Sequence, residues 1–278
     1  MGAHNVLLTG ASDRAALVDA FHQTVSRFDG AVIVADDVPP LPGSPARTRR
    51  VVAPDDAGYV DALLALARDE RVGIVVPTDD ADLHLLARAS SRFEREGVRV
   101  LVSPAPTIAI CRDVYQLSRS LKQRGIQTEE AWLPEHVPLT AAFPVLVRSR
   151  YGGGGGRPSL ARDARDLHFF VSGIRGAIVQ PHDSAPEWAV DVVCDTANCP
   201  VSIVPRRGVL DASIAGLVGR CADVLPFLGP LTIHYRTRAD HPIVTRIVPR
   251  LSHGFGLAAQ GGAAVTDLLV NLWTKEQA

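Results

Sequence analysis

F-P-V-L-V-R-S-R-Y-G-G-G-G-G-R, residues 143–157, joins a strand pattern to five consecutive glycines. Apolar and polar side chains alternate along its first seven residues, which predicts a strand. The glycine run leaves the backbone open to close approach by a ligand, and its N–H groups can bind phosphate oxygens. Arg148, Arg150 and Arg157 add positive charge that suits phosphate. The alternatives are a phosphate-binding loop and a hairpin tip without a ligand, and the arginines favour the phosphate.

Upstream of this stretch, the first hundred residues alternate short apolar runs with helical patterns. Strands are predicted at Asn5–Thr9, Ala31–Ala35, Gly73–Pro77 and Val98–Val102, and helices at 16–25, Tyr59–Arg68 and Asp82–Glu96. Strands that alternate with helices of this length predict βαβ units and a parallel sheet. Ligands of such sheets bind beyond the carboxyl ends of the strands.

Acidic residues follow two of these predicted strands. Asp36 ends the second strand, where a dinucleotide-binding protein has a ribose-binding acid, but the first turn, T-G-A-S-D-R, has one glycine instead of three. A tight turn before a helix is therefore favoured over a dinucleotide site. Asp79, Asp80 and Asp82 could hold a substrate amine or a cation, and the sequence favours the simpler interpretation of a capped helix start.

In the first part, a short basic stretch formed by Arg47, Arg49 and Arg50 is interpreted as a solvated loop.

After about residue 105, strand patterns predominate. In the second part, helices are predicted at Pro106–Cys111, Val114–Arg124 and Ala258–Trp273, and strands at Ala177–Gln180, Trp188–Cys194, Val201–Val204, Leu231–Tyr235 and Ile243–Val248. Neighbouring strands with few helices predict an antiparallel α+β part.

Composition narrows the class of protein. The 278 residues are 46% hydrophobic and 21% charged, with a formal net charge of −1. This charge argues against a nucleic-acid or membrane-surface protein, and no apolar run approaches the roughly 20 residues of a membrane helix. Four scattered cysteines and no export signal indicate reduced thiols and a cytoplasmic location. Lys122 and Lys275 are the only lysines, so any lysine chemistry has two candidates.

Taken in order, the segments resemble the ATP-grasp superfamily, in particular proteins similar to the large subunit of carbamoyl-phosphate synthase and related carboxylate–amine ligases. The resemblance covers nearly the whole chain, and it rests on the order and spacing of motifs that are individually weak. These motifs are N-V-L-L-T-G-A at 5–11, V-P-T-D-D at 76–80, the stretch 111–134, the strand and glycine loop at 143–156, Gln180, E-W-A-V-D at 187–191, V-P-R-R at 204–207, R-I-V-P-R at 246–250 and the glycine-bearing segment 254–262.

The resemblance implies a fold and a chemistry. The fold is α/β followed by α+β: an N-terminal parallel-sheet (pre-ATP-grasp, Rossmann-like) domain over residues 1–105 and a two-lobed ATP-grasp domain over 106–278, with lobes of about 106–180 and 181–278. ATP lies between the lobes, and a carboxylate attacks its γ-phosphate to give an acyl phosphate that an amine then displaces. The residues implied for nucleotide binding are Arg148, Arg150, Gly152, Gly153, Gly154, Gly155, Gly156, Gln180 and Glu187.

The sequence departs from the family pattern where magnesium is expected to bind. Arg148 stands in place of the loop lysine, and Arg246 and Val248 replace the acid and the asparagine of the terminal Glu-x-Asn-Pro-Arg motif. The upstream metal ligand corresponds to His234, a poor partner for a hard, oxygen-seeking ion. No metal ligand is therefore assigned. Arg246, which could take over part of the metal's charge, and Arg250, which could stabilise an acyl phosphate, are the candidate catalytic residues.

The sequence leads to two hypotheses for the function, one enzymatic and one structural. The first is an ATP-dependent carboxylate–amine ligase, with a nucleotide and a small-molecule carboxylate or amine as partners. The second is an inactive relative that serves as a binding or scaffold subunit for a partner enzyme, either with another protein or as a homodimer. Neither hypothesis involves nucleic acid or a membrane.

Overall fold

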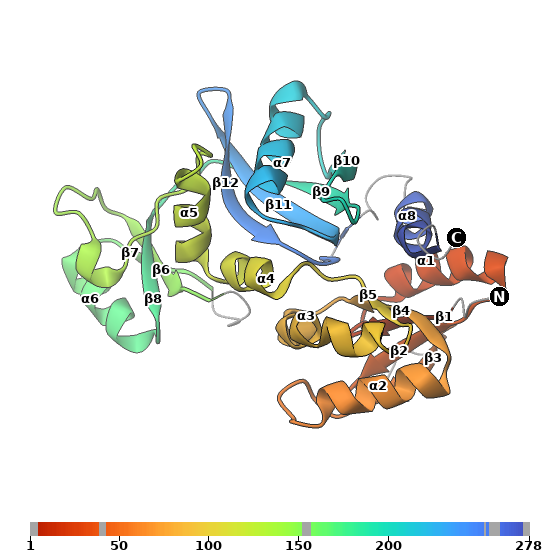
Figure 1. Ribbon diagram of the computed structural model, residues 1–278. Coiled ribbons are helices and arrows are strands. Elements are labelled where there is room, and N and C mark those ends of the chain that lie inside the picture. The colour runs from red at the N-terminus through yellow and green to blue at the C-terminus, as the bar shows by residue number, and fades with distance from the viewer. Residues whose placement is uncertain (1–4, 39–42, 152–156, 253, 256–261, 275–278) are drawn as a thin grey trace.

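The N-terminal part is a five-stranded parallel sheet in the order β3-β2-β1-β4-β5. Figure 1 shows it at the lower right, with α2 and α3 covering one face. The computed structural model describes residues 5–38, 43–151, 157–252, 254–255 and 262–274. The elements of this part are β1 (Asn5–Thr9), α1 (Ala15–Val25), a 3₁₀ turn (Ser26–Phe28), β2 (Val32–Asp36), β3 (Arg47–Arg50), α2 (Tyr59–Asp69), β4 (Val72–Pro77), α3 (Asp80–Glu94) and β5 (Arg99–Val100).

The parallel sheet was predicted correctly, and one strand was missed. All six residues of β4 are buried, because helices cover both faces of the sheet, and this explains the continuous apolar run. The interpretation of Arg47–Arg50 as a loop is wrong: these residues form the edge strand β3, parallel to β2. An edge strand with charged side chains lacks the apolar pattern by which a strand is recognised, and such charges block pairing with other chains.

The second part contains two antiparallel sheets. The larger, in the order β10-β9-β11-β12, comprises β9 (Trp188–Cys194), β10 (Pro200–Pro205), β11 (Gly229–Arg238) and β12 (His241–Val248), with α7 (Ala212–Val224) on one face. The smaller, in the order β7-β6-β8, comprises β6 (Val145–Ser149), β7 (Ser159–Ala161) and β8 (Ala177–Pro181), with α6 (Ala164–Gly173). Helices α4 (Ala105–Arg112) and α5 (Val114–Lys122) precede them, with a 3₁₀ turn at Pro134–His136 and the last helix α8 at Gly262–Thr274.

Two helices of the second part were not predicted. The helix α6 has no buried residue and packs only partly buried side chains on its sheet, so its apolar stripe is weak. The helix α7 buries Leu217, Val218 and Cys221 against the larger sheet, but its two glycines and alanines obscure the helical period. The glycine run 152–156 lies outside the described residues, and so does the predicted start of the last helix at 258–261.

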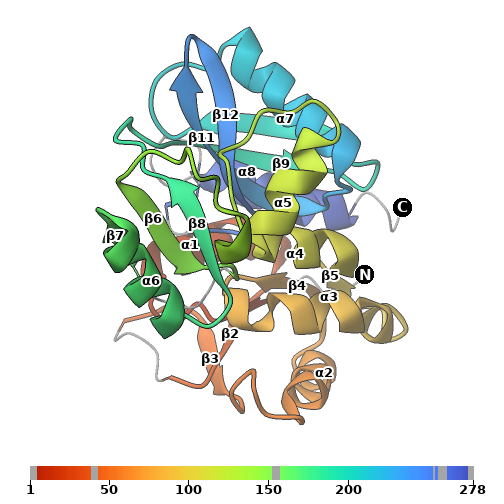
Figure 2. The same cartoon turned by 90° about the vertical axis from the view of Figure 1, so that its left-hand side faces the viewer.

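The last helix packs against the first helix of the chain. Side chains of α8, including Leu269 and Val270, pack in one buried cluster with Leu17, Val18 and Phe21 of α1. Figure 1 shows the two helices side by side, and in the turned view of Figure 2 both lie behind the second part. We propose that the chain divides near residue 105, as the sequence suggests, and that α8 completes the N-terminal unit.

Replacing Leu269 by alanine tests this packing. Leu269 is fully buried, and truncating a buried leucine removes apolar contacts and leaves a cavity, so we expect a loss of about 2–4 kcal/mol in the free energy of unfolding. Urea unfolding followed by circular dichroism measures it. The exposed Asp19→Ala on α1 is the control and should change stability by less than about 0.5 kcal/mol. An equally small effect of Leu269→Ala would show that α8 does not pack on α1.

Candidate functional site

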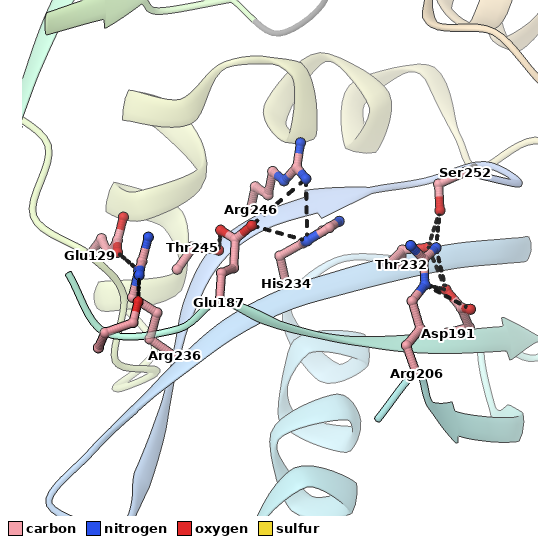
Figure 3. A network of polar contacts seen from close by, with 11 residues as sticks. Glu129, Glu187, Asp191, Arg206, Thr232, His234, Arg236, Thr245, Arg246 and Ser252 are labelled. Carbon is pink, nitrogen blue, oxygen red and sulfur yellow. Dashed lines mark hydrogen bonds and ion pairs between the residues drawn. The ribbon is translucent and has the colours of Figure 1, made fainter. Parts of the chain in front are cut away.

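Three side chains of the larger sheet meet on the face opposite α7. They are Glu187, just before β9, His234 of β11 and Arg246 of β12, and Figure 3 shows them pointing toward one another. Nδ1 of His234 lies 3.4 Å from Oε2 of Glu187, and Nη2 of Arg246 lies 3.8 Å from the same oxygen. His234 and Arg246 are directly opposite each other in the antiparallel register, which places both side chains on one face.

A β-bulge adds a fourth residue to this cluster. His234 pairs with Arg246 and Tyr235 pairs with Val244, so Thr245 is left without a partner across the ladder. In a regular strand Thr245 and Arg246 would point to opposite faces, whereas a bulge can re-aim a side chain. The hydroxyl of Thr245 donates to Oε1 of Glu187 at 2.7 Å, so the two oxygens of Glu187 are held from two sides. The sequence carries no signal for this bulge.

The environment fixes the charge states of this cluster. Burial acts to raise the pKa of Glu187, but the hydrogen bonds from His234 and Thr245 and the charge of Arg246 outweigh it and hold the pKa at about 2. Burial lowers the pKa of His234 despite the hydrogen bond to Glu187, so the imidazole is neutral at neutral pH. Its Nδ1 lies between the carboxylate of Glu187 at 3.4 Å, which can only accept, and Nη2 of Arg246 at 3.3 Å, which can only donate.

Arg148, on β6 of the smaller sheet, lies near enough to this cluster for its charges to act on it. Burial, and after it the charge of Arg246, lowers the pKa of Arg148, while Glu187 and Glu129 act to raise it. No described residue makes a hydrogen bond or an ion pair with Arg148 that would neutralise it. The partly buried Arg148 and the exposed Arg246, from different sheets, therefore act on each other electrostatically, and the sequence-predicted residues Arg148, Glu187 and Arg246 lie near one another.

Arg150 is held elsewhere, although it was grouped with Arg148. Its guanidinium lies 2.7 Å from Oδ2 of Asp113 and packs over the rings of Tyr115 and Tyr151. Asp113 also ends α4 and caps α5 by accepting the N–H of Gln116. Arg150 thus fastens the end of the smaller sheet to the start of α5.

Gln180 of the smaller sheet lies beside β12 of the larger sheet. It is buried on β8 and lines a cavity of about 10 Å³ together with Glu129, Thr245 and residues of α5. A cavity of this volume holds one water molecule at most. Glu129, which the sequence analysis did not single out, pairs with Arg236 of β11 at 2.7 Å.

Arg250 connects the larger sheet to the parallel sheet. Its Nε donates to Oδ1 of Asp80 at 2.6 Å, and Nη1 donates to the carbonyl of Thr78 at 3.1 Å. Burial acts to raise the pKa of Asp80, but the hydrogen bond and charge of Arg250 hold it below its ordinary value. The interpretation of this acidic segment as a capped helix start is confirmed, since Asp79 accepts the N–H of Ala81 at the start of α3.

A further buried network flanks the site on the same sheet (Figure 3). Asp191, only 3% exposed, accepts from Nε of Arg206 at 3.0 Å and from the hydroxyl of Thr232 at 2.7 Å. Ser252 completes it through bonds to Arg206 and Thr232. Thr232 and Ser252 were missed by the sequence analysis, because isolated hydroxyl residues carry no pattern. This network anchors the segment after β12.

The side chains at Arg246 are poor ligands for magnesium. Mg²⁺ prefers several oxygen ligands in octahedral geometry, whereas this cluster offers one carboxylate, from Glu187, and one neutral imidazole, from His234, beside the cationic guanidinium of Arg246. In the part of the chain that the structure describes, no three His, Cys, Asp or Glu side chains form a group that could hold a metal ion. Within the same residues, no helix has the length and apolar character to cross a membrane.

Comparisons with known proteins identify the fold. Residues 6–101 match the family model of the PylC-like N-terminal domain. An L-amino acid ligase from Bacillus licheniformis superposes with a TM-score of 0.75 at 17% identity, over 97% of this chain and 74% of that one. The chain has the ATP-grasp fold.

Two further structures support this fold assignment. N5-carboxyaminoimidazole synthetase from Staphylococcus aureus matches with a TM-score of 0.71 at 16% identity, over 98% of this chain and 78% of that one. Biotin carboxylase from Campylobacter jejuni matches with a TM-score of 0.73 at 11% identity, over 97% of this chain and 70% of that one. The comparison with curated proteins gave no match to the sequence.

Glu187 makes the cluster's contribution to stability dependent on pH. A carboxyl whose pKa falls from 4.5 to about 2 on folding stabilises the protein above pH 4.5, and this contribution is lost as the pH falls toward 2. We expect Glu187→Gln to unfold at lower urea concentration than the parent protein at pH 7, by a margin that shrinks below pH 4.5. The exposed Glu94→Gln on α3 is the control. A margin that is constant from pH 7 to pH 3 would contradict the assigned contacts.

Proposed function

We propose that the protein binds ATP between its two lobes and is related in function to ATP-dependent carboxylate–amine ligases. One observation carries the proposal: the charge of Arg246, on a strand of the larger sheet, repels that of Arg148, on a strand of the smaller sheet, and of the two only Arg246 has a carboxylate partner among the described residues, Glu187 at 3.8 Å. An anion with several negative oxygens would relieve that repulsion. The same synthetase from Staphylococcus aureus is known as a complex with ADP, at a TM-score of 0.67 and 16% identity, which supports a nucleotide as the anion.

In this proposal each side chain has a role that its contacts permit. Arg148 and the loop Gly152–Gly156 hold phosphates, and Glu187, already ionised by its neighbours, accepts a ribose hydroxyl. Gln180 lies at the edge of the base site. Arg250 can contact the carboxylate substrate only if it first gives up its hydrogen bond to Asp80. ATP, when bound, supplies the phosphoryl group that activates a carboxylate for attack by an amine.

The residues present do not fit the magnesium ion that the fold family implies, and we assign no step to it. Arg246 supplies fixed positive charge in the space where the metal is expected. A guanidinium stabilises charge on phosphoryl oxygens, but it cannot bridge and orient two phosphates as a bound dication does. We propose that nucleotide binding does not require magnesium.

A second candidate is an inactive relative that binds nucleotide and serves as a scaffold for another protein or as a homodimer. The observation in its favour is that Arg150 and Arg250, which the resemblance implies for the site, are both held in ion pairs with carboxylates. We propose a cytoplasmic location for either function, because all four cysteines are free.

Isothermal titration of ATP, with and without magnesium, tests nucleotide binding. We expect the same dissociation constant within about threefold in both conditions, and a loss of about tenfold or more in Arg148→Gln, because a charge-assisted contact to phosphate is removed. Arg165→Gln, an exposed charge on α6, is the control. Binding that appears only with magnesium would refute the role of Arg246, and no binding at all would refute the nucleotide site.

Phosphate release separates the active ligase from the scaffold. The full-length protein is incubated with ATP, magnesium and a panel of amino acids as carboxylate and amine donors, and inorganic phosphate is measured over time. A ligase releases phosphate only when both the carboxylate substrate and the amine substrate are present. Arg246→Ala should abolish this release. If the protein binds nucleotide but releases no phosphate with any pair of amino acids, the scaffold function is supported.

A further inference from the structure

Arg112, the last residue of α4, lies against the start of α3. Figures 1 and 2 show these two helices next to each other. Nη1 of Arg112 lies 2.7 Å from Nδ1 of His84, which follows Asp80 by one helical turn on α3. Residues four apart share one face of a helix, so Arg112 lies on the face of α3 that carries Asp80.

The hydrogen bond to His84 holds Arg112 without neutralising its charge. A guanidinium can only donate, so Nδ1 of His84 accepts, and we assign the imidazole proton to Nε2. Burial lowers the pKa of His84, and the charges of Arg112 and Arg88 lower it further. The imidazole is therefore neutral at neutral pH, and it fixes the direction of the guanidinium but supplies no negative charge.

No described carboxylate forms an ion pair with Arg112, although its side chain is half-buried. Asp80, on which its charge acts, already accepts from Nε of Arg250 at 2.6 Å. Burial acts to raise the pKa of Asp80, but the hydrogen bond and charge of Arg250, and after them the charges of Arg112 and Arg246, lower it. Arg112 and Arg250 together therefore bring two positive charges to one carboxylate.

Arg112 is close to the proposed phosphate site but is not part of it. The charge of Arg246 acts on both Arg148 and Asp80. Burial and then Arg246 lower the pKa of Arg148, whereas Arg112 and Arg250 do not act on it. When phosphates occupy the positions beside Arg148 and Arg246, the charge of Arg112 is still left for a second anion next to them.

We propose that Arg112 binds the carboxylate group of the substrate that ATP activates, and that His84 positions its guanidinium for this contact. The assignment rests on the proposed function, in which a carboxylate must lie next to the terminal phosphate of ATP. A guanidinium has five N–H donors in a planar fork, so Arg112 keeps its bond to His84 and has others left for a carboxylate. Arg250 would first have to leave Asp80.

Acetate, the smallest stable carboxylate with a methyl group, is the probe. It is titrated at neutral pH into the full-length protein labelled with nitrogen-15, and the Nε–Hε signals of the arginine side chains are followed by nuclear magnetic resonance. Arg112→Gln identifies the Arg112 signal by its loss and keeps a donor for His84. We expect acetate to shift this signal along a saturating curve that sodium chloride at equal ionic strength does not reproduce.

Variants that retain Arg112 test the positioning role of His84. His84→Ala removes the acceptor, and we expect it to weaken acetate binding about fivefold; His84→Asn restores an acceptor and should bind within about twofold of the parent protein. Arg88→Gln is the matched control, because it removes an exposed positive charge that also acts on His84. It should bind acetate within about twofold of the parent protein.

A repeat of the titration with a bound non-hydrolysable ATP analogue separates a carboxylate site from a phosphate site. We expect acetate still to bind, within about fivefold of its affinity without nucleotide. Three results would overturn the inference: a shift that does not saturate, equal weakening by Arg88→Gln and His84→Ala, or exclusion of acetate by the analogue, which would assign Arg112 to a phosphate. Saturating acetate binding without any ATP binding would refute the proposed function and leave a carboxylate site at Arg112.

Discussion

The candidate site depends on the electrostatic repulsion between two arginine side chains from different sheets. Arg148 comes from the smaller sheet and Arg246 from the larger, and the charge of Arg246 lowers the pKa of a guanidinium already lowered by burial. Burying Arg148 near a second positive charge costs free energy, because like charges repel each other more strongly away from water. The contacts to Glu187 offset part of this cost, and an anionic ligand would offset the rest.

The surrounding structure is arranged to keep those charges in place. The bulge at Thr245 turns a hydroxyl and Arg246 to the same carboxylate, so Glu187 stays ionised inside the cluster. Behind it, the buried Asp191–Arg206 network holds the end of β12, and Arg250 ties that end to Asp80 of the first domain. The Arg150–Asp113 pair does the same for the smaller sheet and α5. Ion pairs at these junctions fix how the three sheets meet.

Much of the fold could be predicted from the sequence, because it depends on apolar periodicity. The buried strand β4 and the amphipathic helix α2 are visible as patterns, and the order of the motifs leads to the ATP-grasp fold. What could not be predicted are features that depend on tertiary contacts. The edge strand β3 is charged, α6 has a weak apolar stripe, and the bulge at Thr245 exists only in the pairing of two strands. For the same reason the sequence suggests that Arg150 belongs with Arg148, whereas Asp113, distant in the chain, holds it elsewhere.

The most direct test of the central claim is a crystal structure of the protein with a non-hydrolysable ATP analogue and manganese, whose anomalous scattering reports any bound metal. We expect phosphate oxygens within hydrogen-bond distance of both Arg148 and Arg246, and no anomalous peak between them. A manganese ion coordinated between the phosphates and the larger sheet, with Arg246 turned away, would contradict it.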